Sequence, residues 1–164
     1  MDFYMKLPRN KKEFALFLAV ISIISVNIIA PVITCMEAGF SMRVYMQALR
    51  AIPFIWITVV TLVLLTHKPA DFLTHKIVSE GDSFNAVILA NILCCVFCMS
   101  IFLTVIGTWI GMREISMAPI YSFFYKWPRN FAISFAVEAL IAQPFARFVI
   151  LKFHQAEGKA VPSL

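Results

Sequence analysis

The chain has 164 residues, of which 61% are hydrophobic and 14% are charged, and its formal net charge at pH 7 is +5. Soluble domains are closer to one half apolar and one quarter charged, so this composition excludes an ordinary soluble domain. The basic residues lie at the ends of apolar runs and form no continuous stripe, which is typical of contact with lipid headgroups. We therefore expect the lipid bilayer as the main partner, and no nucleic acid.

Four apolar runs are long enough to cross the hydrocarbon, which takes about twenty helical residues. The first run is too long for the apolar core of a signal peptide and no A-x-A site follows it, so we interpret it as an anchor that is kept. The sequence predicts an all-α integral membrane four-helix bundle, with spans at about 14–34, 50–70, 84–110 and 128–152.

Prolines mark the expected kinks, because proline has no N–H to donate to the carbonyl four residues back. Pro53 is expected to open the second span and Pro128 the fourth. The full set of predicted kinks is Pro31, Pro53, Pro69, Pro128 and Pro144.

An internal repeat appears when the chain is aligned with itself at an offset of seventy-five positions. The matching pairs include Ser41-Met42 with Ser116-Met117, Pro53 with Pro128, and Pro69 with Pro144. We interpret residues 1–78 and 79–164 as two copies of a helical hairpin. Since each copy holds an even number of spans, the two repeats would be parallel and would enter the membrane in the same direction.

Charge asymmetry predicts the orientation of the spans. Nine basic residues fall on the side of the chain ends and five on the other side, which favours both termini in the cytoplasm. The first group is Lys6, Arg9, Lys11, Lys12, Lys68, Lys76, Arg147, Lys152 and Lys159, and the second is Arg43, Arg50, Arg113, Lys126 and Arg129.

Three segments carry a family resemblance: the L-P-R-N-K-K-E lead, the K-x-W-P-R-N opening of the fourth span and its Q-P-F-A-R exit. Through them the chain resembles a bacterial membrane family catalogued as domain of unknown function 2798, a two-helix unit often found duplicated. The second span departs from the pattern, with Phe54-Ile55 where Arg129-Asn130 stand in the fourth. The resemblance implies a bacterial inner-membrane protein with a duplicated fold, and it brings no activity or catalytic residues.

Glu138 is the strongest candidate for function, since a carboxylate near the bilayer centre costs about 2.5–3.5 kcal/mol on insertion scales. Asn130 and Ser134 share its helix face at four-residue spacing. Two interpretations stay open: a proton or cation site, with Thr58, Thr61, Ser100 or Thr104 in its lining, or a neutral acid bonded to a facing helix. The candidate polar site comprises Glu138, Ser134, Asn130, Asn27, Gln143 and Arg147.

Small residues on the third span predict a face for helix packing, because they let backbones approach closely. This set is Ser100, Thr104, Gly107 and Gly111.

No catalytic or cofactor motif is present, so we do not predict an enzyme. Cys94, Cys95 and Cys98 lie in an apolar run without acidic neighbours, which favours packing over metal binding. Soft-metal handling is a distant alternative, because sulfur ligands that suit copper(I) gather at the outer face. They are Cys35, Met36, Met42, Met46, Met112 and Met117.

The first expectation for function is a non-enzymatic accessory or structural membrane protein, acting through a second copy of itself or a membrane-protein partner. The alternative is a small oligomeric transporter or channel for an unidentified ion or small molecule, with a proton- or cation-linked site at Glu138. Whether Glu138 lines a hydrated cavity or packs dry distinguishes the two.

Overall fold

The computed structural model describes residues 8–79 and 81–156, which are helical apart from short connections. The order is α1 (Lys11–Ala38), α2 (Met42–Ile77), α3 (Phe84–Met112), α4 (Ala118–Tyr121), α5 (Phe123–Val137), the π-helical turn η2 (Glu138–Ala142) and α6 (Gln143–Ala156). Within this part of the chain, four helical segments are long and apolar enough to cross a membrane. Lys6 and Lys159, and with them the start of the first predicted repeat (1–7) and the end of the second (157–164), lie outside the described residues.

The first predicted span is confirmed as α1, which extends about one turn beyond 14–34 at each end. Its start is fixed by a reciprocal cap. Asn10 Oδ1 accepts from the Glu13 N–H at 2.9 Å, and Asn10 Nδ2 donates to Glu13 Oε1 at 2.7 Å. Such a cap satisfies N–H groups of the first turn that have no partner within the helix.

The second span differs from the prediction. It begins at Met42, where the Ser41 hydroxyl accepts from the Val44 N–H at 3.2 Å, and it continues for 36 residues through Pro53 and Pro69. The expectation that Pro53 opens this span is therefore wrong. A proline removes one backbone hydrogen bond, but the helix is held on both sides of it by residues buried against α1 and α3.

The third span is confirmed as α3, capped by Ser83. The fourth begins at Phe123, so Pro128 lies inside α5 and does not open it. Ser116, the repeat partner of Ser41, caps no helix; its carbonyl accepts from Trp109 Nε1 at 2.8 Å. The α1 helix also continues across Pro31.

The fourth span is interrupted by η2, directly before Pro144. There the Gln143 N–H donates to the Glu138 carbonyl, five residues back. The ring of Pro144 and its missing N–H disfavour the ordinary ladder to Leu140, and one wider turn absorbs the mismatch. The sequence predicts a disturbance at Pro144, and the structure places it in the preceding turn, which contains Glu138. Single π-turns of this kind are frequent at functional sites.

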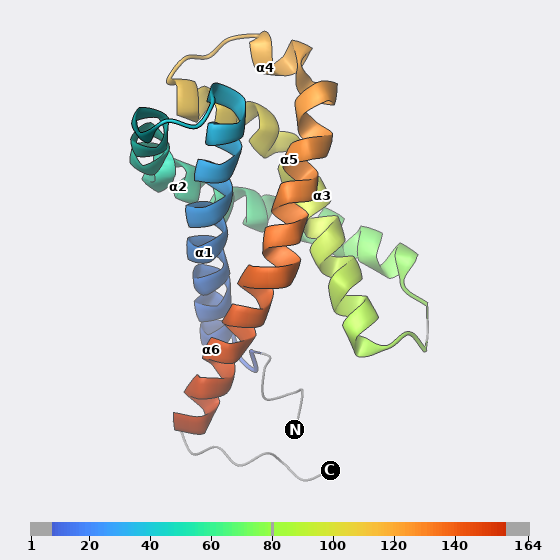
Figure 1. The fold of residues 1–164 in the computed structure, drawn as a ribbon. Helices are drawn as coiled ribbons and strands as arrows, with labels where there is room; N and C mark the ends of the chain where they lie inside the picture. The colour runs from blue at the N-terminus through green and yellow to red at the C-terminus, as the bar shows by residue number, and fades with distance from the viewer. Residues whose placement is uncertain (1–7, 80, 157–164) are drawn as a thin grey trace.

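The four long segments pack as a ring (Figure 1). α1 contacts α2, α2 contacts α3, α3 contacts α5, and α1 contacts α5, η2 and α6. The start of α1 and the end of α6 lie at one end of the molecule, here called the terminal end. The connections 39–41 and 113–117 lie at the other, here called the loop end (Figure 1).

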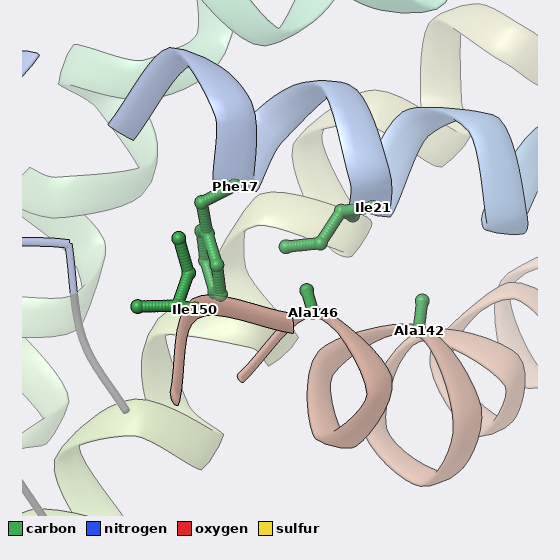
Figure 2. Close-up of a cluster of buried hydrophobic side chains, with 5 residues drawn as sticks. All are labelled: Phe17, Ile21, Ala142, Ala146 and Ile150. Atoms are coloured by element: carbon green, nitrogen blue, oxygen red, sulfur yellow. The ribbon is translucent and has the colours of Figure 1, made fainter. Parts of the chain in front are cut away.

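A buried apolar contact joins α1 to the fourth span. Phe17 and Ile21 of α1 point toward Ala142, Ala146 and Ile150 (Figure 2). Ala142 and Ala146 are 0% exposed and one turn apart, so their small side chains bring the two backbones close together.

The predicted packing role of Gly107 and Gly111 is not seen within the chain. A Cβ atom added at either glycine would meet nothing within 4 Å among the described residues. The small-residue contact seen in this fold is the Ala142–Ala146 pair of the fourth span, which was not predicted.

Candidate functional site

A cavity of about 850 Å³ lies between the helices of the ring. Its lining includes apolar side chains such as Val26, Val59 and Met99. The same lining carries hydroxyl, amide and carboxyl groups from α1, α3 and the fourth span, and this set of residues is called the polar wall. They are Ser22, Ser25, Ser100, Thr104, Asn130, Ser134, Glu138 and Gln143.

Glu138 contributes the carboxyl group of the polar wall. The Ser25 hydroxyl of α1 donates to Glu138 Oε2, across a sequence separation of 113 residues. Glu138 is placed by η2, and the residues that follow it on the same span pack against α1 through Ala142 and Ala146. A carboxyl group held in this way can bind a proton, or a cation when ionised, at the edge of an enclosed volume.

The predicted polar site is only partly assembled. Asn130, Ser134 and Gln143 line the cavity with Glu138, as their shared helix spacing indicated. Asn27 does not join them, because it is exposed and its amide donates to the Ile23 carbonyl of its own helix at 2.7 Å. Arg147 lies one turn beyond Gln143 and is outside the lining.

The third span presents Ser100 and Thr104 to the same volume. Ser100 accepts from Trp127 Nε1 at 2.9 Å and donates to the Phe97 carbonyl at 3.0 Å. Thr104 is 3% exposed, and its hydroxyl has no hydrogen-bond partner among the described residues. A buried hydroxyl without a partner carries a desolvation cost, so it marks a place for a bound polar group or water.

Other threonines named as lining candidates lie elsewhere. Thr58 donates to the Phe54 carbonyl and Thr61 to the Ile57 carbonyl, each at 2.9 Å; Thr61 is exposed, Thr58 is half-buried, and neither lines the cavity. Because these hydroxyls are satisfied by their own helix, they play no part in the cavity.

An aromatic row positions α5 against α3. Phe123, Trp127, Phe131 and Phe135 stack in sequence, with ring centroids 5.9, 5.8 and 6.2 Å apart. Phe97 of α3 meets Trp127 edge-on at 5.6 Å. This row was not predicted, although its four-residue spacing is a readable signal in the sequence, since residues four apart are neighbours on a helix.

An ion-pair cluster lies at the loop end, next to the polar wall. Glu37, at the end of α1, pairs with Lys126 Nζ at 3.1 Å and with Arg129 at 3.3 Å. The same Arg129 nitrogen donates to Asn130 Oδ1 at 3.4 Å. Asn130 is thus connected to the ion pairs, which no spacing in the sequence predicts because Glu37 and Lys126 lie 89 positions apart.

A second pair lies at the terminal end, outside the cavity lining. His154 Nε2 and Glu13 Oε2 are 2.9 Å apart, and both side chains are buried. The sequence signal was the Asn10-x-x-Glu13 cap spacing, which placed Glu13 at the first turn of α1 but did not name its partner.

The sulfur-containing residues divide between the cavity and the surface. Cys95 lines the cavity and Cys94 is buried beside it, and the cysteines are free thiols. No group of three or more His, Cys, Asp or Glu suited to a metal ion occurs among the described residues. The methionines expected at the outer face, Met36, Met42, Met46, Met112 and Met117, are exposed at the loop end. Soft-metal handling there stays a prediction.

Comparison with known proteins found no match to any family model, curated protein or solved structure. The resemblance to the duplicated two-helix family therefore stays a prediction, based on its three segments.

Proposed function

We propose that this chain is a multi-pass protein of a bacterial inner membrane. In support, large apolar side chains are exposed along the long helices, where lipid would be their natural solvent. At the loop end, four aromatic side chains are more than four-fifths exposed, which suits the headgroup region. They are Phe40, Tyr121, Phe124 and Tyr125.

The orientation that we propose places both termini in the cytoplasm. The terminal end carries exposed basic residues from α1, α2 and α6, whereas Lys126 and Arg129 at the loop end are neutralised in part by Glu37. Reporter tags on the two ends of the chain should report the same compartment. Opposite compartments would contradict this topology.

The duplicated hairpin is also a proposal. The ring order supports it, because the α1–α2 and α3–α5 contacts occupy corresponding places, as do the α2–α3 and α1–α6 contacts. A parallel repeat with its axis along the membrane normal would produce this alternation.

Within that setting we favour a small transporter or channel with a proton- or cation-linked site at Glu138. The single observation that carries this proposal is that the Glu138 carboxyl lines a cavity of about 850 Å³. A non-enzymatic accessory or structural role, with a second copy or another membrane protein as partner, would require no such volume beside a buried carboxyl. The cavity also lies within one chain, so an oligomer is not needed to enclose it.

Access of a charged reagent to the cavity tests the proposal. In a cysteine-free background, Ser134→Cys would place a thiol in the polar wall, Ala142→Cys in the dry α1 contact and Ala136→Cys on the exposed outside of α5. In lipid vesicles we expect a membrane-impermeant cationic methanethiosulfonate to modify Ser134→Cys and to spare the two controls. Equal protection at all three positions would contradict a hydrated cavity and favour the accessory role.

Binding at Glu138 has its own measurement. Tetraethylammonium, as a test cation, should slow the modification of Ser134→Cys, and the additional change Glu138→Gln should abolish this protection. Protection that persists in the Glu138→Gln variant would show that the Glu138 carboxyl does not bind the test cation.

A further inference from the structure

A second polar cluster lies where α2 and α3 meet, near the terminal end. His67 Nδ1 is 3.3 Å from Asp71 Oδ2, and Asn91 Nδ2 donates to Asp71 Oδ1 at 3.1 Å. Asn91 Nδ2 also lies 3.4 Å from Thr74 Oγ1. Both carboxylate oxygens of Asp71 are therefore engaged, one by its own helix and one by the neighbouring helix.

This cluster faces both the outside and the cavity. The His67 and Asp71 side chains are 55% and 39% exposed, and His67 and Asn91 also belong to the lining that contains Glu138. Cys95, one turn beyond Asn91, is part of the same lining and lies 3.7 Å from Asn91 Oδ1.

The distance between His67 and Glu138 along the bundle can be estimated from their contacts with α1. The Phe14 ring lies 6.4 Å from the His67 ring, and Ser25 bonds Glu138. Phe14 and Ser25 are about three helical turns apart, which is roughly 16 Å at 1.5 Å per residue. Along this stretch α1 lines the cavity with Phe14, Phe17, Leu18 and Ile21 before the hydroxyl groups of Ser22 and Ser25, and α3 adds Asn91 and Cys95. A proton path over this length needs water between these polar groups.

Other charged groups do not compete for this position. Around His67, α1 offers the Phe14 ring and α3 offers Asn91 and Cys95, while Lys68 next to it on α2 is exposed and outside the lining. Among the described residues, the remaining charged side chains of the lining belong to the loop end. They are Glu37, Arg50, Arg113, Glu114 and Lys126.

We propose that His67 and Asp71 form a second proton-binding site, which exchanges protons between the aqueous phase at the terminal end and Glu138. This inference rests on the proposed function of Glu138. Asp71 takes a proton from water and passes it to His67 Nδ1. The imidazolium then releases a proton from Nε2 into the cavity water, and the Glu138 carboxylate takes up a proton from that path to become a neutral acid. Asn91 positions the Asp71 carboxylate and takes no proton.

Infrared difference spectroscopy of the protein in lipid vesicles tests the relay without a transported solute. The band of the protonated Glu138 carboxyl is identified by its loss in Glu138→Gln, and its rise after a rapid drop in pH gives the protonation rate. We expect His67→Gln to slow this rate by about a hundredfold, the lower end of what a positioned proton-transfer group contributes. Asp71→Asn keeps a side chain of the same shape that binds no proton, so it should slow the rate similarly.

His75→Gln is the matched control. His75 lies on the same helix, is exposed, and contacts the Asp71 backbone carbonyl and not its side chain. Its replacement should leave the rate unchanged. If the wild-type protein shows no Glu138 band that responds to pH, the Glu138 site itself fails and the relay fails with it. If the band responds at the wild-type rate in both His67→Gln and Asp71→Asn, the relay is overturned and the Glu138 site stands.

Discussion

The Ser25 hydroxyl of α1 donates to the Glu138 carboxylate of the fourth span, joining residues 113 positions apart on the polar wall of the cavity. The contact holds the Glu138 side chain against Ser25 of α1 and so connects the first and last long segments of the ring. Among the described residues, the Ser25 hydroxyl is the donor recorded for this carboxyl, and the adjoining volume can admit water or a solute.

Ser25→Ala removes that donor. We expect it to lower the free energy of unfolding by about 1 kcal/mol, within the range of interhelical hydrogen bonds in membrane proteins. Ser22→Ala is the matched control, because Ser22 is also buried in the lining of α1 and makes no hydrogen bond to Glu138. Its effect should stay within about 0.5 kcal/mol. Unfolding in detergent, followed by circular dichroism, measures both, and equal losses would remove the special role of Ser25.

Ala146→Leu tests the α1 contact shown in Figure 2. Ala146 is fully buried against Phe17 and Ile21, so a larger side chain must push the two helices apart. We expect a loss of about 1–3 kcal/mol, typical of overpacking. Ala136→Leu makes the same change at an exposed position of α5 and should cost less than about 0.5 kcal/mol. Thermal unfolding compares them, and similar midpoints for the two variants would contradict the contact.

Glu37→Gln leaves Lys126 and Arg129 without their shared anion. Because these side chains are partly exposed, we expect a modest loss of about 1 kcal/mol. The difference from the wild-type protein should shrink in about 1 M salt, where charges are screened within a few ångströms. Glu114→Gln, at an exposed position of the same end, should have no measurable effect. A Glu37→Gln effect that does not depend on salt would argue against the ion pairs.

The Glu13–His154 pair is best measured with a double-mutant cycle, because the single changes also alter other contacts of both residues. Glu13→Gln, His154→Gln and the double variant should give a favourable coupling of about 1–3 kcal/mol, as for groups in direct contact. The exposed His67–Asp71 pair, measured in the same way, should give less than about 1 kcal/mol. A coupling near zero for the buried pair would show that the two ends of the chain are joined by other means.

Local helix structure was predictable where one physical factor dominates. A long apolar run forms a helix because each backbone group then has a partner within its own segment, and the four expected spans coincide with four long helical segments. The prediction was wrong at Pro53 and Pro128, where proline was expected to begin a span. Buried neighbours on both sides of Pro53 keep α2 continuous, and the neighbours come from other parts of the chain.

At the candidate site, the sequence predicted which residues share a helix face, but not which residues that face contacts. Four-residue spacing was enough to place Asn130, Ser134 and Glu138 on one side of a helix. It could not say what that side would meet. Asn27 appeared equally suitable by composition and depth, yet it is exposed, because the rotation of α1 is set by Phe17 and Ile21 packing on Ala142 and Ala146.

The sequence alone thus determined the number and apolar character of the four long helical segments and the identity of one carboxyl group inside the last of them. The tertiary structure decided that this carboxyl meets Ser25 at the edge of a cavity, that Glu37 and Glu13 pair with residues of the fourth span, and that His67 and Asn91 share the lining with Glu138. The physical reason is that periodicity follows from backbone geometry within one helix. Partners follow from how helices rotate and pack, which depends on side-chain volumes brought together from distant parts of the chain.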